Sequence, residues 1–573
     1  MTIPILVANS FLEDLAVVLC VAAVTTVIFH GLRQPVVVGY LVAGMIVGPY
    51  TPGIFVDASR LHGVSELGVI LLMFALGLEF SIRRLLRLGP RAAFITAVQV
   101  GLMIWLGYIC GRALGWSELE SIFTGALLSI SSTTIVAKAF AEQQVGTDLR
   151  DLALGVLLCE DLVAVIMLAV LTPLGAGATL SAVALEWTGL RLGIFLLAMV
   201  GGGFLVIPPL VRFVVRMGRD ETLVVASIGI CFGFAMQAER AGYSVALGAF
   251  LAGSLVAESG QAERLEELIR PLRDVFAAVF FVSVGMMIDP ALIVAHWQAL
   301  ALLVGILLVG KTVGVTLGAM LAGTPAPLAV QTGLSLAQIG EFSFIIAGVG
   351  VETGAAHTFL YSIAVALSAI TTFTTPFMIR ACGPVGAMIE SRAPLALARL
   401  QRVYDGWVER VSASRAGADG RPGVAAPAFF LIAGALCVAA VVIAIDLAGR
   451  PIERVIISAG IVTTRAATTV ADLLALAVVV IGTAAMLFGA HQLAVRLADH
   501  RTLPAGGTLQ DWERGVMIEI LQLAIMVCAG LLLLAVLQPF LQIREGVVIL
   551  LLMASAIAVV IWRGARRLAA IRA

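Results

Sequence analysis

The chain has 573 residues, of which 61% are hydrophobic and 13% are charged, and its mean hydropathy is +1.07. Soluble domains carry about 25% charged residues, so this composition excludes a soluble globular protein and predicts a membrane protein with many spans. The formal net charge is zero and indicates no particular partner. The seven cysteines form no CxxC pair or Cys/His cluster, so they predict no disulfide framework, zinc site or redox site.

The N-terminal stretch MTIPILVANSFLEDLAVV has no basic n-region and no A-x-A cleavage site. We therefore expect its apolar run to be a retained helix and not a signal peptide. A spanning helix needs about 20 apolar residues. Divided at glycine, proline and charge clusters, the sequence predicts thirteen spans, centred on residues 12–30, 34–50, 65–80, 92–111, 121–140, 150–173, 188–211, 221–238, 241–257, 274–288, 297–322, 326–350 and 357–381.

Four further spans are predicted near 428–449, 470–492, 515–538 and 545–562, after a polar linker at about 384–426. The fold class expected is therefore an all-α polytopic membrane protein, with domains at 1–383, 384–426 and 427–573. Basic residues concentrate on cytoplasmic loops. With the N-terminus outside and the C-terminus inside, 27 basic residues fall on the inner side and eight on the outer side. This division predicts that orientation and an odd number of spans.

Polar groups occur near the middle of four predicted spans, where charge is costly and by default indicates function. They are SISSTT at 129–134, the pair Glu160 and Asp161, Lys311, and AQIGEFS at 337–343. The spans that hold SISSTT and AQIGEFS are seven helices apart, so they run in opposite directions. Polar breaks at one depth in two such spans predict inverted repeats with discontinuous helices, which build ion sites at the midplane.

A broken helix exposes free carbonyls at one end and free amides at the other, with partial charges of about half a unit. Glu341 is suited to balance the amide end and Lys311 the carbonyl end. Asp161 is then left to hold either a cation or a proton, which is the minimum chemistry of antiport. Hydroxyls of Ser and Thr with unwound carbonyls would complete an oxygen shell for a hard monovalent cation. Lys311 could also pair with Asp161 when no ion is bound.

Two plainer interpretations stay open. Lys311 could lie near a span end and extend its ammonium to the interface. Alternatively, a salt bridge from Asp161 or Glu160 to Lys311 could simply hold two helices together.

Several stretches resemble the bacterial monovalent cation:proton antiporters, in the branch that includes the glutathione-gated potassium efflux systems. They are GYLVAGMIVGP (39–49), LGVILLMFALGLEF (67–80), SISSTTIVAKAF, LCEDLVAV, LGAFLAGSLVAES (247–259), FFVSVGMMID (280–289) and AQIGEFSFII, which together cover about residues 10–383 in order. The resemblance implies a thirteen-helix transport domain in the bacterial inner membrane, usually a homodimer, that works by an elevator-like movement.

The resemblance also implies that Asp161 is the shared ion and proton site and that Lys311 matches the membrane lysine of some members. The broken helices match Ser131, Ser132, Thr133 and Thr134 in one span and Gln338 to Glu341 in the other. We therefore expect Asp161, Glu160, Thr133, Thr134 and Gln338, with the two serines, to line the site. The substrates would be K⁺ or Na⁺ and H⁺, with no cofactor.

Two features depart from the family pattern. Glu160 occupies a position that is commonly Gln in potassium efflux members and Asn or Asp in sodium exchangers, so cation choice and stoichiometry stay open. No strand followed by GxGxxG occurs after residue 383, where such members usually continue into a nucleotide-binding domain. Instead, LALARLQRVYDGWVERV predicts a basic amphipathic helix on the membrane surface. The last four spans carry almost no charge at their middle, and their role stays open.

Exchange of monovalent cations for protons, with K⁺ favoured, is the leading hypothesis. A cation channel, a sodium-coupled organic anion symporter and a membrane scaffold remain alternatives. An enzyme is not expected, because the sequence contains no phosphate loop, nucleophile elbow or metal-ligand set.

Overall fold

The computed structural model describes residues 6–7, 11–32, 36–51, 54–55, 58–79, 82–143, 145–176, 182–392, 487–495 and 511–537. These residues are almost entirely helical, as the sequence predicts. Two short strands, β1 (Leu6–Val7) and β2 (Ile54–Phe55), pair in parallel near the N-terminus.

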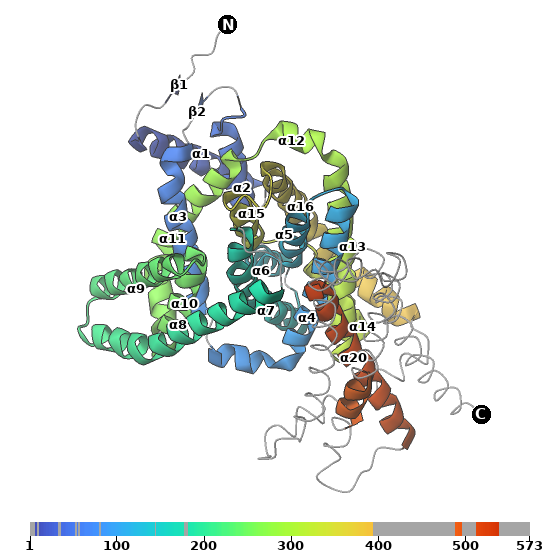
Figure 1. The fold of residues 1–573 in the computed structure, drawn as a ribbon. Coiled ribbons are helices and arrows are strands. Elements are labelled where there is room, and N and C mark those ends of the chain that lie inside the picture. The colour runs from blue at the N-terminus through green and yellow to red at the C-terminus, as the bar shows by residue number, and fades with distance from the viewer. Residues whose placement is uncertain are drawn as a thin grey trace, which may run out of the picture.

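The helices follow one another in chain order (Figure 1). They are α1 (Phe11–Gly31), α2 (Val36–Val47), α3 (Ala58–Glu79), α4 (Ile82–Ala113), α5 (Glu118–Ser129), α6 (Thr133–Gln143), α7 (Thr147–Gly175), α8 (Ala182–Arg216), α9 (Asp220–Arg240), α10 (Val245–Val256), a π-helical turn (Ala257–Gln261), α11 (Ala262–Met286), α12 (Pro290–Ala295), α13 (Trp297–Leu321), α14 (Ala326–Ser335), α15 (Glu341–Glu352), α16 (Thr358–Arg392) and α20 (Asp511–Leu537).

Each of the thirteen spans predicted before residue 384 contains a helix or a pair of half-helices. In the described part of the chain, seven helices are long and apolar enough to cross a membrane by length and composition. The remaining spans are shorter or have polar ends. The helix α11 begins twelve residues before its predicted span, because its first turns, AERLEELIRPL, are too polar to register as an apolar run.

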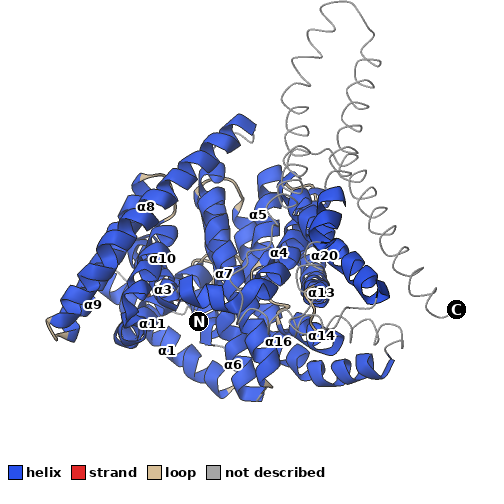
Figure 2. Ribbon diagram, turned by 90° about the horizontal axis from the view of Figure 1, so that it is seen from below, coloured by secondary structure: helices blue, strands red, loops and turns tan. Residues whose placement is uncertain are grey.

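Two groups of helices pack side by side, and both ribbon views separate them (Figures 1 and 2). One group contains α1–α3 and α8–α11, with α3 against α10 and α11, and α2 against α11. The other contains α4–α7 and α13–α16, with α4 against α5 and α13, and α14 against α16. The long helix α7 lies between the groups and contacts α8 and α10. The fold is therefore a bundle of broken helices beside a bundle of mostly continuous ones.

Glycines bring helices of the first group to backbone contact. A Cβ atom on Gly285 of α11 would lie 2.2 Å from the carbonyl oxygen of Leu41 on α2, and one on Gly44 of α2 would lie 2.1 Å from that of Val282. Small residues allow this close approach in membranes, where helix association depends on van der Waals packing. These reciprocal contacts join α2 to α11 firmly.

The second group contains the two predicted helix breaks. The first span divides into α5 and α6 around Ile130–Ser132, and the second into α14 and α15 around residues 336–340. Ser and Thr side chains compete for backbone hydrogen bonds, and Ile130 adopts an extended conformation with φ −105° and ψ 131°. The sequence SISSTT therefore breaks the helix where it was predicted to.

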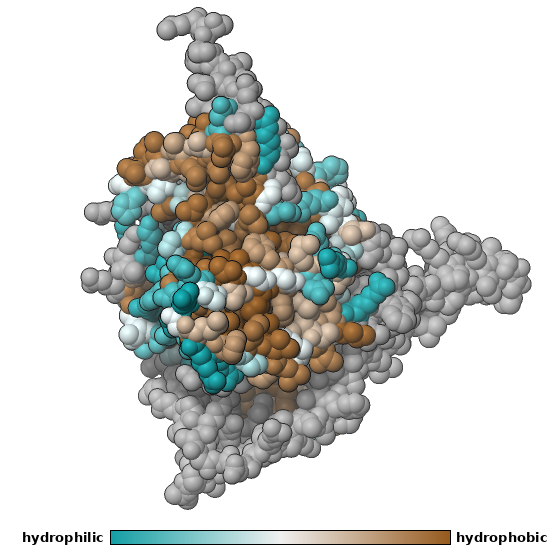
Figure 3. Space-filling model, turned by 90° about the vertical axis from the view of Figure 1, so that its left-hand side faces the viewer, coloured by the Kyte–Doolittle hydropathy of each residue, from teal (hydrophilic) through white to brown (hydrophobic). Residues whose placement is uncertain are grey.

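Large apolar side chains cover the outside of the protein. Figure 3 shows them over much of the face that lies on the left of Figure 1, where α8 and α9 are located. Leu197 and Leu205 of α8 are each 77% exposed, and Val225 of α9 is 71% exposed. Contact with lipid is favourable for apolar side chains, so this surface agrees with the membrane location that the composition predicts.

At the C-terminal end of the transport domain, α16 continues to Arg392, past the boundary predicted at residue 383. Gly386 lies against the side chain of Gln331 on α14, which keeps this extension packed. Of the four later spans, the one near 515–538 is present as α20, and residues 487–495 are helical. The amphipathic linker helix and the spans near 428–449 and 545–562 lie outside the described residues.

Candidate functional site

The two helix breaks meet in the middle of the second group. The backbone amide of Gly340 donates a hydrogen bond to the carbonyl of Ile130 at 3.0 Å. Ser131 Oγ donates to the carbonyl of Leu336 at 3.0 Å, and Gln338 Nε2 donates to the carbonyl of Ser132 at 3.2 Å. A Cβ atom on Gly340 would lie 2.5 Å from the Ser131 carbonyl oxygen, so only glycine permits this crossing. The breaks thus satisfy one another's free backbone groups.

Lys311 reaches this crossing from α13, and its side chain is completely buried. Its ammonium donates to Ser131 Oγ at 2.6 Å and to the carbonyl of Gln338 at 2.9 Å. The ammonium therefore contacts both breaks at once. It does not reach the interface, so the structure is incompatible with the snorkelling interpretation.

Glu160 binds the same crossing from α7. Its Oε2 accepts a hydrogen bond from the backbone amide of Ser131 at 2.7 Å and lies 3.8 Å from Lys311 Nζ. Its Oε1 is buried and has no hydrogen-bond partner among the described residues. The ion pair that the structure gives to Lys311 is thus with Glu160, whereas the sequence left open a pairing with Asp161.

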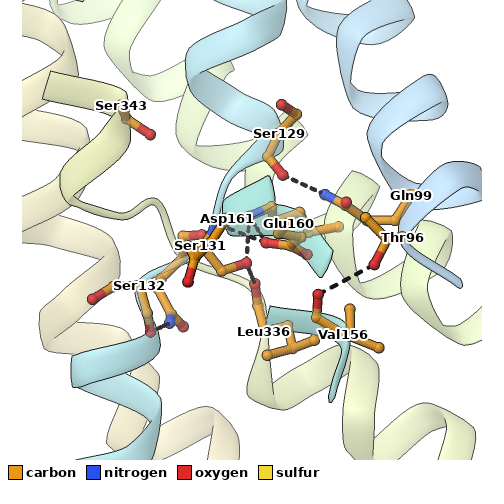
Figure 4. A network of polar contacts seen from close by, with 12 residues as sticks. Thr96, Gln99, Ser129, Ser131, Ser132, Val156, Glu160, Asp161, Leu336 and Ser343 are labelled. Atoms are coloured by element: carbon orange, nitrogen blue, oxygen red, sulfur yellow. Dashed lines mark hydrogen bonds and ion pairs between the residues drawn. The ribbon is translucent and has the colours of Figure 1, made fainter. Parts of the chain in front are cut away.

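Asp161 follows Glu160 on α7 (Figure 4), and its hydrogen-bond partner differs from those of Glu160. Its Oδ2 accepts a hydrogen bond from Thr133 Oγ1 at 3.0 Å, and the residue is 3% exposed. The nearby carboxylates of Glu341, Glu160 and Glu79 act on it electrostatically. Asp161 is therefore a buried carboxyl group among other carboxyl groups, away from the bonded partners of Lys311.

The start of α6 joins this carboxylate cluster to the second break. Ser132 Oγ accepts a hydrogen bond from the amide of Ile135 at 3.3 Å, as an N-cap does, and donates to Glu341 Oε2 at 3.3 Å. Glu341 is the first residue of α15, where a negative charge is favoured by the helix dipole. Thr134 is the second residue of α6, and its side chain lies outside the described residues.

Three polar residues of the site were not predicted from the sequence. Gln99 of α4 is completely buried, and its Nε2 donates to the carbonyl of Ser129 at 2.9 Å, at the free end of α5. Thr96 Oγ1 donates to the carbonyl of Val156 at 3.2 Å, and Thr375 Oγ1 of α16 donates to Gln338 Oε1 at 3.3 Å. Figure 4 shows Gln99 and Thr96 on one side of the carboxyl groups and Ser132 on the other. The sequence signal that could have identified Gln99 is that it is a glutamine within the apolar span predicted at 92–111.

The charges of the site are unequal. The site holds one ammonium, that of Lys311, and three carboxyl groups, the buried ones of Glu160 and Asp161 and the partly buried one of Glu341. Buried charges must be neutralised by a partner, an ion or a proton. In the part of the chain that the structure describes, no group of three His, Cys, Asp or Glu residues is arranged to hold a metal ion. The donors at Asp161 are oxygens, which suit a hard cation.

Comparison with known proteins identifies similar chains. The putative cation/proton antiporter YbaL of Escherichia coli is 34% identical over 342 residues, which are 58% of this chain and 61% of the relative. The glutathione-regulated potassium-efflux system protein KefC of Cronobacter sakazakii is 35% identical over 317 residues, 54% of this chain and 51% of the relative. The chain thus spans between about half and two thirds of the length of these two relatives.

A solved structure of the sodium proton antiporter MjNhaP1 from Methanocaldococcus jannaschii superposes with a TM-score of 0.49 at 16% identity, over 66% of this chain and 97% of that one. The family model for the transmembrane sodium/hydrogen exchangers matches residues 16–381, which contain both helix breaks and every candidate residue named above. The chain belongs to this family of multi-pass cation:proton antiporters, whose members are transporters and not enzymes.

Proposed function

We propose that the protein exchanges a monovalent cation for protons across the membrane, with Asp161 as the shared binding site. The observation that carries this proposal is the excess of carboxyl groups over ammonium groups at the crossing of the two helix breaks. Because Lys311 is already engaged by Glu160, Ser131 and Gln338, the carboxyl group of Asp161 needs a cation or a proton from outside. A cation and a proton at one carboxylate compete, and this competition couples their movements.

The remaining residues have distinct parts in this proposal. Thr133 and Thr134 of α6 and Gln338 line the site with Ser131 and Ser132. Glu160 tunes the site or holds an additional proton, while Lys311 and Glu341 balance the charges of the helix ends. Two contacts support this assignment. Lys311 donates a hydrogen bond to the carbonyl of Gln338, and Glu341 is the first residue of α15.

Alternating access follows from the two helix groups. The residues assigned to the site above all lie in the group α4–α7 and α13–α16, so an elevator-like shift of that group against α1–α3 and α8–α11 would carry them between the two faces. Reciprocal glycine contacts within the latter group support its role as a fixed scaffold. We further propose a homodimer in the bacterial inner membrane with the N-terminus outside and the C-terminus cytoplasmic, as the distribution of basic residues favours.

K⁺ is favoured over Na⁺ as the exchanged cation, because the relative KefC is named as a potassium-efflux protein. The oxygen donors around Asp161 accept either ion. Glu160 stands where potassium efflux members commonly have Gln, so the stoichiometry is left to experiment.

The test is proton flux in vesicles that contain the purified protein and a preset pH gradient. K⁺, Na⁺, Li⁺ and Rb⁺ are added in turn to wild type, Asp161→Asn and Asp151→Asn. Asp151 is an exposed carboxylate on the same helix and serves as the matched control. We expect K⁺ to collapse the gradient with wild type and Asp151→Asn, and Asp161→Asn to leave it intact. Normal flux with Asp161→Asn would refute the assignment, and K⁺ current without proton flux would identify a channel.

A further inference from the structure

The C-terminal helix α20 packs against the ion-site group at a defined place. It contacts α4 and α13, the helices that carry Gln99 and Lys311 (Figure 1). The family model matches residues 16–381, so it does not include this helix and assigns it no role. Its position therefore provides the first indication of what the C-terminal part of the chain does.

The contact with α4 is close and apolar. A Cβ atom on Gly101 of α4 would lie 3.2 Å from Leu531 Cβ on α20, so the two helices approach to backbone distance. Val98, one turn earlier on α4, packs with Ala524 and Val527 of α20 and with Leu321 of α13. Residues 98 and 101 are three apart and share one face of α4.

An adjacent face of α4 contacts α13 through a glycine stripe. Gly310, Gly314 and Gly318 of α13 recur every four residues, and Cβ atoms there would lie 2.9–3.2 Å from the nearest atoms of Leu106, Leu102 and Ile95. A small residue every four positions brings helix axes close together in membranes. The helices α20, α4 and α13 therefore form one closely packed layer, with Lys311 beside the first glycine of the stripe.

The layer connects directly to the ion site. Gln99, next to Val98 in the sequence, donates to the carbonyl of Ser129 at the free end of α5. On its other side, α20 contacts the helical residues 487–495, where His491 Nδ1 lies 3.1 Å from Gln522 Oε1 and Ala490 packs with Met526. One helix thus joins the C-terminal segment to the helix that supports the first break.

We propose that the face of α4 formed by Val98 and Gly101 is the docking surface of the C-terminal module, and that α20 moves together with the ion-site group during transport. Docking presses α4 onto the glycine stripe of α13 and so holds Gln99 against the end of α5. The movement rests on the exchange activity proposed above, whereas the docking does not. The partner of this surface is a segment of the same chain.

The test links the two helices covalently. Gly101→Cys and Leu531→Cys are combined with Cys528→Ala, which removes a native thiol from the same contact. A disulfide needs Cβ atoms about 3.5–4.5 Å apart, so the Cβ atoms of residues 101 and 531, 3.2 Å apart at this contact, must separate by about 0.3–1.3 Å. We expect the disulfide to form in membranes, as read by mass spectrometry of the linked peptides. We further expect cation-driven proton flux to stay within about twofold of the reduced protein.

Failure of the disulfide to form would refute the docking, and a linked protein that is arrested until it is reduced would refute the joint movement. Formation of the disulfide is measured without any transport assay. A failure of the docking proposal is therefore distinguished from a failure of the proposed exchange activity. A second variant, Gly101→Leu, should displace α20, increase the alkylation of Cys528 and lower the flux about fivefold or more. Gly305→Leu on α13 is its control, because a Cβ atom there meets nothing within 4 Å. Increased alkylation of Cys528 with full flux would contradict a role for docking in transport.

Discussion

The ammonium of Lys311 lies 3.8 Å from Oε2 of Glu160, and both side chains are completely buried. The same ammonium bonds to both helix breaks, and the same carboxylate accepts the amide of Ser131. The pair therefore stabilises the crossing of the two broken helices and leaves Asp161 outside its bonds. With the exchange site proposed above, Glu160 would belong to the structural pair and Asp161 to the ion site, which would account for two adjacent acids in the middle of a membrane helix.

We predict that Lys311→Met lowers the free energy of unfolding by about 3–5 kcal/mol, because it leaves Glu160 without its buried partner. The double variant Lys311→Met/Glu160→Gln should recover part of that loss, since it removes both charges. Thermal unfolding of the two single variants and the double variant gives the coupling energy between the residues. Additive losses in the double variant would mean that the two side chains do not interact.

Thr133 offers a test of the site that does not remove its charge. Thr133→Val deletes the hydroxyl that donates to Asp161 Oδ2 and keeps the shape of the side chain. We predict that it weakens the apparent cation affinity by about tenfold, the equivalent of about one hydrogen bond to a charged group. Thr133→Ser keeps the hydroxyl and should stay close to wild type. Equal affinities for the Val and Ser variants would argue against Thr133 as part of the site.

Gln99 tests the support of the first helix break. Gln99→Leu removes the donor to the Ser129 carbonyl, which is then buried without that partner, and should cost about 1–3 kcal/mol of stability. We expect the flux to fall as well, because the end of α5 is less well held. Gln237→Leu on α9 replaces an exposed glutamine and is the control for adding an apolar side chain. An equal melting temperature for the two variants would contradict the supporting role.

The rigidity of the scaffold group is tested at Gly285. In Gly285→Val the new Cβ would lie 2.2 Å from the Leu41 carbonyl oxygen, so α2 and α11 must separate. We predict a loss of about 1–3 kcal/mol from overpacking. Gly305→Val introduces the same β-branched residue on α13 where a Cβ meets no neighbour, and it should leave the stability unchanged or slightly raised, because valine has a higher helix propensity than glycine. Similar melting temperatures for the two valine variants would show that the glycine contact is dispensable.

Hydropathy and breaker residues predicted most of the fold. The thirteen spans of the transport domain and both helix breaks lie where the pattern placed them, because the bilayer sets helix length and because Ser/Thr and Gly stretches weaken helices locally. The pattern missed the polar first half of α11 and the continuation of α16 to Arg392. Both segments are stabilised by packing and lack the continuous apolar run on which hydropathy depends.

The sequence by itself predicted which charged residues lie inside the membrane. Glu160, Asp161 and Lys311 occur within apolar runs that are long enough to span a bilayer. The sequence did not determine how they pair. Glu160 and Asp161 are adjacent, so on a helix they point about 100° apart, and only the crossing of α5–α6 with α14–α15 decided which of them meets Lys311. The supporting contacts of Gln99 and Leu531 likewise depend on distances between segments far apart in the chain. No local pattern encodes such distances, because they are set by the packing of one helix on another.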